Sequence, residues 1–457
     1  MKSFPTRASM EAYRIAGQAA LPLMRARYAQ RVRDGLERAD RLQEHFGRPS
    51  LARDEGCYVW FNAGSADEAR SMLPLVRLCL SQNLNVVATS PCRYGLALWE
   101  QEAANNSSLA AQYTPVDVDR CVNRFLSHWQ PELMITVADE VMPVAMACLQ
   151  QRQISCVVVS GVIGRRAHDF WSVRPKLARE TFGAIALVAA ADQVNAEMFR
   201  DLGARNVEVC GDLSFDAPVR SDGRHIHRAF WAREGLAEET NLWLATPSND
   251  KELALCLETQ RALELAGANI VCALAPPPSM RMSDIETAVS SSGLNLSKPP
   301  LGDYKQAHHE GWAASANVLL FDFGEDGERA AIRSDAIYLG GAFGNGRSEG
   351  LSPVPAIQHR LAIASGERVQ RHVGFFSQLH RANAVRLVSS GSDLAGFLSI
   401  VLADKDAHRR MTDAALRTLW SMQGATDSTY MALDRYLRPL IYKASIDSIP
   451  PSVHAAE

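Results

Sequence analysis

The chain has 457 residues, which is longer than one hydrophobic core usually organises, so we expect two domains. Hydrophobic residues make up 47% of the sequence and charged residues 22%, a composition typical of globular proteins. The formal net charge is only −3, so the overall charge does not favour a nucleic-acid partner, and we expect none.

The first predicted element is a helical segment within residues 1–50. An apolar patch in this segment is followed by four arginines, Arg25, Arg27, Arg31 and Arg33. Two interpretations stay open: the helix packs on its own protein, or it lies on an anionic membrane surface with the arginines at the headgroups. No stretch reaches the ~18 apolar residues of a transmembrane helix, and we expect no signal peptide, so a membrane contact would be peripheral.

From residue 55 onward, short apolar runs alternate with amphipathic patterns. Such runs suit strands that are buried on both faces of a parallel sheet. A polar stretch at 221–235 interrupts this alternation and separates two sets of six predicted strands. The first set is 57–63, 85–90, 133–138, 156–161, 184–190 and 207–213, and the second is 242–247, 269–276, 317–322, 336–341, 361–366 and 385–390.

This alternation predicts an α/β protein with two Rossmann-like, doubly wound domains facing a cleft. In such folds the site lies at the carboxyl ends of the strands. We expect an N-terminal domain over 51–222, a C-terminal domain over 223–425, and a C-terminal helix and tail over 426–457.

The corner between the first strand and the first helix carries the sequence Ser65-Ala66-Asp67-Glu68. The S-x-x-E spacing is that of a capping box, in which both side chains bind free N–H groups at a helix start. A carboxylate at the end of a strand can also act as a general base in a cleft. Both interpretations stay open, and they compete for one side chain. The helix itself shows the spacing of a buried face, at Met72, Leu75, Val76 and Cys79.

Two glycine-containing loops and several acidic strand ends are further candidates. The loops 161–171 and 340–350 each follow a strand and either bind an anion such as a nucleotide phosphate or form exposed turns. Asp139, Glu140 and Asp322 lie at strand ends without ligand histidines, so we predict no metal site. The nine cysteines include no C-x-x-C pair and predict buried thiols in a reducing compartment. We expect no cofactor.

Several ordered blocks carry a family resemblance. The segment WFNAGSADE (60–68) resembles the W-[IF]-H-A-V-S-V-G-E motif of the Kdo transferases. The blocks 45–50, 139–143 and 196–216 are similar to that family's R-F-G-R-P-S, E-T-E-L-W-P and E-R-F-x-x-L-G-A…G-N-L-K-F-D segments. The resemblance covers roughly residues 10 to 440, strongly up to about 220. It implies a GT-B glycosyltransferase of lipopolysaccharide synthesis that moves Kdo from CMP-Kdo onto a lipid A precursor.

The resemblance also implies the roles of individual residues in the N-terminal half. Glu68 matches the family's catalytic base, which deprotonates the acceptor hydroxyl before an inverting displacement of CMP. Glu140 matches the second glutamate of E-T-E and would support it. Ser65 would lie beside the substrate, and Arg166 would bind anionic groups.

In the C-terminal half, the resemblance implies a binding site for the CMP-activated donor. PSNDKE (247–252) looks like the family's S-T-H-x-G-E and keeps two of its residues. The carboxylate of the family's M-G-E has its counterpart near residues 325 and 326. The residues implied in donor binding are Ser248, Glu252, Glu325, Asp326, Gly344, Gly346 and Ser352.

Departures from the family pattern occur in both halves of the chain. Asn62 replaces a histidine and Ser214 a lysine, while PPPS (276–279) stands where the family has P-R-H-P. Val354 replaces a glutamate that is an expected partner of the nucleotide ribose. Two alternatives therefore stay open: a transferase with another sugar donor, or a catalytically silent paralogue that acts as a binding or regulatory protein. The expected location is the cytoplasmic face of the inner membrane, peripherally bound, or the cytoplasm.

Overall fold

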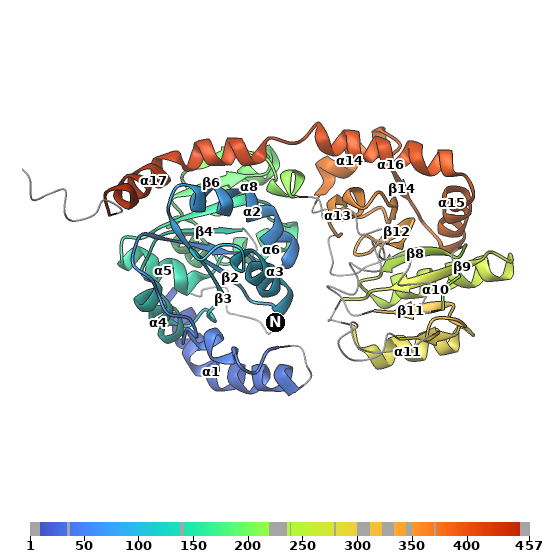
Figure 1. The fold of residues 1–457 in the computed structure, drawn as a ribbon, viewed down its shortest axis with the longest axis horizontal. Coiled ribbons are helices and arrows are strands. Elements are labelled where there is room, and N and C mark those ends of the chain that lie inside the picture. The colour runs from blue at the N-terminus through green and yellow to red at the C-terminus, as the bar shows by residue number, and fades with distance from the viewer. Residues whose placement is uncertain are drawn as a thin grey trace, which may run out of the picture. The chain divides into compact units, whose positions relative to one another are not determined.

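The computed structural model describes residues 10–33, 37–137, 141–218, 235–237, 239–277, 280–298, 311–321, 333–343, 350–369 and 372–447. The chain divides into two compact units. Unit 1 comprises Met1–Pro218 and Met422–Glu457, and unit 2 comprises Val219–Ser421. Each unit is a parallel sheet with helices packed against it (Figure 1). The division into acceptor-binding and donor-binding domains stays a prediction.

Within the described residues of unit 1, seven strands form one sheet in the order β3-β2-β1-β4-β5-β6-β7. The strands are β1 (Tyr58–Asn62), β2 (Asn85–Ser90), β3 (Leu109–Tyr113), β4 (Pro131–Val137), β5 (Ser155–Gly161), β6 (Leu187–Ala190) and β7 (Val207–Val209). The helices are α1 (Met10–Arg33), α2 (Ala66–Ser81), α3 (Arg93–Ala103), α4 (Asp119–Trp129), α5 (Pro143–Gln151), α6 (Arg165–Ser172), α7 (Pro175–Phe182), α8 (Gln193–Asp201) and α17 (Ala425–Asp447), with short 3-10 turns η1 (Leu42–Phe46) and η3 (Leu213–Asp216).

Unit 2 repeats this architecture. Its described residues form a second seven-stranded sheet in the order β10-β11-β9-β8-β12-β13-β14. The strands are β8 (Asn241–Thr246), β9 (Ile270–Leu274), β10 (Leu296–Ser297), β11 (Val318–Leu320), β12 (Ala336–Leu339), β13 (Ala362–Ser365) and β14 (Val385–Leu387). The helices are α10 (Asp250–Leu265), α11 (Met282–Ser291), α13 (Val354–Gln358), α14 (Val373–Arg381), α15 (Gly391–Ala403) and α16 (Lys405–Trp420).

The connectivity of each sheet creates a place where the strand order reverses. In unit 1 the chain steps outward from β1 to β2 and β3, then returns to place β4 on the other side of β1. In unit 2 the corresponding reversal lies between β8 and β12. Doubly wound folds bind ligands outside the carboxyl ends of the strands at this reversal. The predicted α/β, GT-B type fold of two Rossmann-like domains is confirmed.

The sheet of unit 1 separates two apolar layers, because successive side chains of a strand point to opposite faces. From β1, Val59 and Phe61 pack with helices α2, α3 and α17, whereas Tyr58 and Trp60 pack with α4, α5, α7 and α8. The predicted buried face of α2 is confirmed, since all four of its residues lie in the first layer: Met72, Leu75, Val76 and Cys79.

Helix α17 follows unit 2 in the sequence but belongs to unit 1. Leu433 and Leu437 enter the first apolar layer of unit 1. The carboxylate of Asp216 accepts hydrogen bonds from the N–H groups of Gly424 at 2.9 Å and Thr426 at 2.6 Å, which fixes the start of the helix. The chain therefore returns to complete the core of its first unit.

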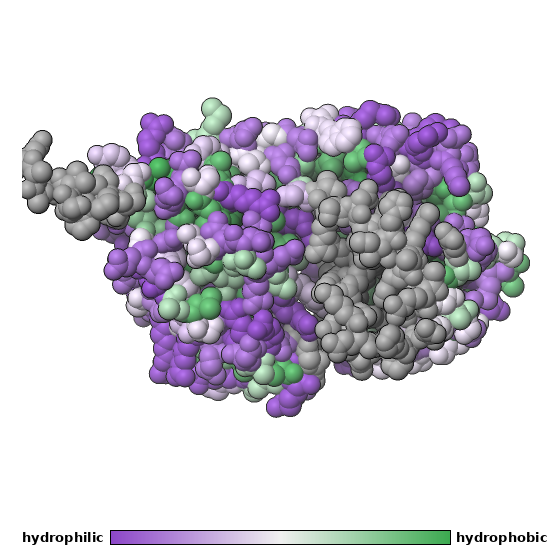
Figure 2. All heavy atoms as spheres, in the orientation of Figure 1, coloured by the Kyte–Doolittle hydropathy of each residue, from purple (hydrophilic) through white to green (hydrophobic). Residues whose placement is uncertain are grey.

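Helix α1 lies on the surface of unit 1 and buries little of itself, with Leu21 as its buried residue. Leu21 packs with Phe46, Val118 and Cys121. On the face shown in Figure 2, hydrophilic side chains cover much of unit 1, and hydrophobic ones form small areas between them. In the part of the chain that the structure describes, no helix is both long and apolar enough to cross a membrane.

Candidate functional site

The corner between β1 and α2 places Glu68 at the carboxyl edge of the sheet in unit 1. Ser65 occupies the N-cap position, and its hydroxyl accepts a hydrogen bond from the N–H of Glu68 at 3.2 Å. The carboxylate of Glu68 accepts one from the N–H of Gly64 at 2.9 Å. Ser65 thus caps the helix as the sequence predicts, whereas the carboxylate of Glu68 binds the N–H of Gly64, one residue before the Ser65 N–H that a capping box uses. Glu68 itself is only partly buried.

Beneath this corner, Asn62 connects the ends of neighbouring strands. Its side-chain oxygen accepts hydrogen bonds from the hydroxyls of Thr89 at 2.8 Å and Thr114 at 2.7 Å. Its amide nitrogen donates to the hydroxyl of Thr136 at 3.2 Å, and the indole N–H of Trp60 donates to Thr89 at 2.8 Å. All five residues are buried, so Asn62 closes a polar network within the sheet. Buried polar groups are stable when they are paired in this way.

Unit 2 contains a corner of the same design between β8 and α10. Asn249 occupies the N-cap, and its side chain accepts hydrogen bonds from the N–H groups of Lys251 and Glu252, both at 3.1 Å. The carboxylate of Glu252 reaches back to the N–H of Ser248 at 2.7 Å. Asn249 and Glu252 have the same three-residue spacing as Ser65 and Glu68. This spacing is visible in the sequence and could have revealed the repeated corner, which sequence reasoning missed.

The two glutamates differ in their surroundings. The side chain of Glu252 is fully buried, with 0% exposure, and also accepts hydrogen bonds from the N–H groups of Gly341 at 2.8 Å and Phe343 at 2.9 Å. Glu68 is partly exposed at the equivalent place in unit 1. A partly exposed carboxylate can meet a substrate, whereas a fully enclosed one cannot.

The loop after β5 carries the predicted anion-binding arginine. Helix α6 begins at Arg165 behind Gly164, which contributes no capping side chain, and Arg165 and Arg166 are exposed. The N–H of Ile163 is fixed by the side-chain oxygen of Asn195 at 2.8 Å. Strand β5 ends at Gly161 and belongs to the same parallel sheet as β1. The two arginines therefore come shortly after the carboxyl end of β5 in the sequence, and Glu68 comes shortly after the carboxyl end of β1.

The glycine-rich loop predicted at 340–350 begins at Gly340, where the backbone is closely packed. A side chain at Gly340 would meet the backbone oxygen of Thr246 at 1.9 Å, so only glycine fits there. The N–H of Leu351 donates to the oxygen of Gly340 at 3.2 Å and closes the loop. Ser352 accepts a hydrogen bond from the N–H of Val354 at 3.4 Å, and Val354 is buried in the first turn of α13. An apolar side chain in this position offers a ribose no hydrogen bond.

The remaining predicted site residues lie outside the described residues, namely Glu140, Glu325, Asp326, Gly344 and Gly346. In the described ranges, no three His, Cys, Asp or Glu side chains gather as metal ligands. All nine cysteines are described, none of them forms a disulfide, and eight are buried. Burial raises the pKa of the Cys79 and Cys156 thiols to about 12, so these cysteines serve as apolar core residues.

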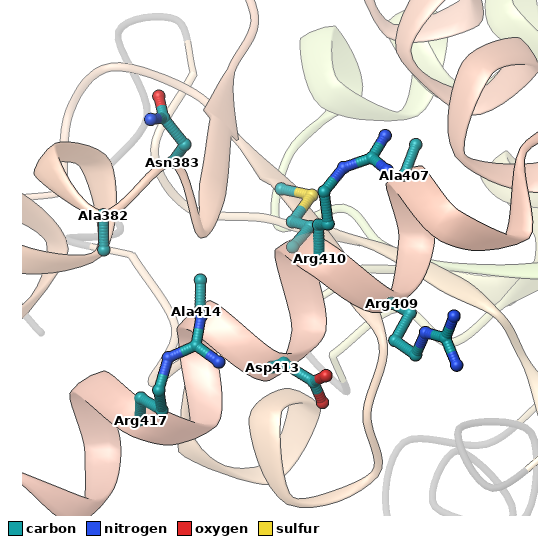
Figure 3. Close-up of a pocket in the computed structure, with 9 residues that line it drawn as sticks. Ala382, Asn383, Ala407, Arg409, Arg410, Asp413, Ala414 and Arg417 are labelled. Atoms are coloured by element: carbon teal, nitrogen blue, oxygen red, sulfur yellow. The ribbon is translucent and has the colours of Figure 1, made fainter.

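A surface hollow of about 590 Å³ in unit 2 is lined by α16 and the turn that follows α14. It carries three arginines, but their side chains point in different directions and do not converge on one point (Figure 3). Arg409 pairs with Asp406 at 2.7 Å, and Arg410 faces Asp404 at 3.6 Å. The hollow therefore lacks the focused positive charge of an anion site.

Comparison with known proteins shows which family this chain resembles. The model of a family described as 3-deoxy-D-manno-octulosonic-acid transferase (kdotransferase) matches residues 40–217. The 3-deoxy-D-manno-octulosonic acid transferase of Haemophilus influenzae is 22% identical over 397 residues, covering 86% of this chain and 90% of that protein. The enzyme of the same name from Rickettsia conorii is 19% identical over 402 residues, covering 85% and 81%.

Among solved structures, UDP-GlcNAc 2-epimerase from Neisseria meningitidis shares the fold. It matches with a TM-score of 0.53 and 12% identity, and the match covers 83% of this chain and 100% of that chain.

Proposed function

We infer that the chain is a divergent member of the Kdo transferase family, and on this basis we propose that it moves Kdo from CMP-Kdo to a lipid A precursor. The observation that carries the proposal is the position of Glu68. This partly exposed carboxylate stands at the carboxyl end of β1, beside the reversal of strand order in unit 1.

In the proposed reaction, Glu68 is the general base. It takes the proton of an acceptor hydroxyl, whose oxygen forms a bond to the anomeric carbon of Kdo on the face opposite CMP. The bond from that carbon to the phosphate oxygen breaks, and CMP leaves with the electron pair. The first turn of α2 favours the ionised form of Glu68, because the positive end of the helix dipole lies there. Moving away from Gly64 would cost one local hydrogen bond.

Glu140 is proposed as the partner of Glu68. Asn62 in β1 pairs in register with Thr136 in β4, and β4 ends at Val137, three residues before Glu140 in the sequence. Glu140 itself lies outside the described residues, and its supporting role is proposed from the family resemblance.

The donor is proposed to bind unit 2 at the carboxyl ends of β8 and β12. Ser248 and Ser352 flank this edge, and Glu325, Asp326, Gly344 and Gly346 are assigned to it from the family resemblance. Arg166 in unit 1 is proposed to bind an anionic group of a substrate. The buried Val354 favours a second candidate, a transferase whose donor does not need a carboxylate at the ribose.

Peripheral contact with the cytoplasmic face of the inner membrane is proposed for α1. Ile15 and Leu23 are 65% and 74% exposed on this helix. Arg25 and Arg27 are exposed near Leu23. Arg31 instead donates to Glu37 at 2.8 Å, so it is less available to lipid headgroups than its neighbours. Exposed apolar residues flanked by arginines are typical of helices that lie on anionic membranes.

Calorimetric titration of the purified protein with CMP-Kdo tests the proposal, with transfer to a lipid A precursor assayed in parallel. We expect a saturable heat of binding and sugar transfer. The absence of heat at millimolar donor would contradict the proposed donor. Binding without any transfer would instead indicate a silent paralogue.

A further inference from the structure

Glu252 occupies a closed pocket of backbone N–H groups inside unit 2. Its carboxylate accepts hydrogen bonds from Ser248 at 2.7 Å, from Gly341 at 2.8 Å to both oxygens, and from Phe343 at 2.9 Å. The hydroxyl of Tyr338 lies 3.4 Å from the same carboxylate. The side chain has no exposed surface. These contacts join the first turn of α10 to the segment that leaves β12.

Successive backbone N–H groups turned toward one point form the kind of nest that binds phosphate in other proteins. Here the protein's own carboxylate fills the nest. The N–H groups of Gly341 and Phe343 are therefore already engaged and do not face a nucleotide. Charge-assisted hydrogen bonds of this kind are about twice as strong as neutral ones, so the carboxylate holds its loop firmly.

The packing around this nest leaves the loop little freedom. A Cβ atom at Gly340 would lie 1.9 Å from the backbone oxygen of Thr246 and 3.0 Å from the carboxylate of Glu252. A Cβ atom at Gly366 would lie 2.3 Å from the backbone oxygen of Ala342. The turn from Gly340 to Phe343 is thus enclosed by β8 and by the end of β13, and Glu252 supplies its inner hydrogen bonds.

We propose that Glu252 is a positioning residue for the donor site: it holds the Gly341–Phe343 turn at the reversal of strand order in unit 2 and does not touch the nucleotide. This inference rests on the proposed function, because it assumes that a cytidine nucleotide binds at this edge. It differs from the expectation from the sequence, in which Glu252 contacts the donor directly.

The test compares Glu252→Gln with Glu258→Gln, the same change at an exposed position of the same helix. An amide would place N–H donors against the backbone N–H groups of the nest. We expect Glu252→Gln to weaken CMP binding at least 10-fold and to speed amide hydrogen exchange at Gly341 and Phe343. Glu258→Gln should change neither, and acceptor affinity should stay unchanged in both variants.

Unchanged CMP affinity, or unchanged exchange at Gly341 and Phe343, in a folded Glu252→Gln protein would overturn the proposal. If this variant does not fold, Glu252→Asp takes its place with the same readouts, because it keeps the charge but shortens the reach. Wild-type protein that does not bind CMP would contradict the proposed donor class. Hydrogen exchange would still decide whether Glu252 holds the turn.

Discussion

At the scale of single residues, the surroundings of a carboxylate decide what it can do. Glu68 and Glu252 follow their N-caps at the same spacing, and both accept a hydrogen bond from the residue four positions earlier. The capping geometry was predictable from sequence because it depends on neighbours within four residues. The nest around Glu252 was not predictable, because Gly341 and Phe343 are 89 and 91 positions away.

The capping function of Ser65 can be separated from the chemistry of Glu68. Ser65→Ala removes the hydroxyl that accepts the Glu68 N–H, so we expect a loss of about 1 kcal/mol in the free energy of unfolding. Transfer activity should stay within about threefold of wild type, since the carboxylate remains. Urea unfolding and a transfer assay measure the two effects. A loss of activity as large as that of a Glu68 variant would assign the hydroxyl a direct role.

At the scale of elements, apolar runs predicted most strands of both sheets but missed β3 and β10. The β3 sequence LAAQY has no β-branched residue, and β10 has only two residues, so neither produces a strong apolar pattern.

Helix α5 shows a second limit of prediction from the sequence. Its N-cap Met142 provides no capping side chain, and Asp117 from the loop after β3 accepts the N–H groups of Val144 and Ala145 instead. A cap supplied from another element leaves no local signature.

Asp117 should make stability depend on pH. Burial, opposed by the two N–H groups, raises the pKa of Asp117 from 3.8 to about 6, so the folded state favours its neutral form. This contribution to stability is present at pH 4 and is lost as the pH rises through about 6. Relative to Asp117→Asn, wild-type protein should lose on the order of 2 kcal/mol between pH 4.5 and pH 7.5. Urea unfolding across this range checks it, and a pH-independent difference would contradict it.

At the scale of the whole molecule, sequence reasoning recognised two α/β units but treated the last helix as a separate segment. The apolar spacing of α17 indicates that one face of the helix is buried, but it does not indicate whether that face packs against unit 1 or unit 2. That choice depends on contacts such as the one between Tyr436 and the backbone oxygen of Ala186, which are 250 positions apart.

The dependence of unit 1 on α17 can be measured within the intact chain. Leu433 is fully buried in the first apolar layer, whereas Met431 on the same helix is 77% exposed. We expect Leu433→Ala to lower the free energy of unfolding by about 2–4 kcal/mol, through lost burial and the cavity left behind. Met431→Ala should change it by less than about 0.5 kcal/mol. Equal effects of the two variants would show that α17 does not stabilise unit 1.

The most direct test of the proposed function is single-turnover sugar transfer by wild type and Glu68→Gln, from CMP-Kdo to a lipid A precursor. Glutamine keeps the size of the side chain but cannot take a proton, so we predict a rate at least about 100-fold lower. The affinity for CMP-Kdo should stay unchanged, because the donor is proposed to bind unit 2. Transfer by Glu68→Gln at the wild-type rate would contradict the assignment of Glu68 as the base.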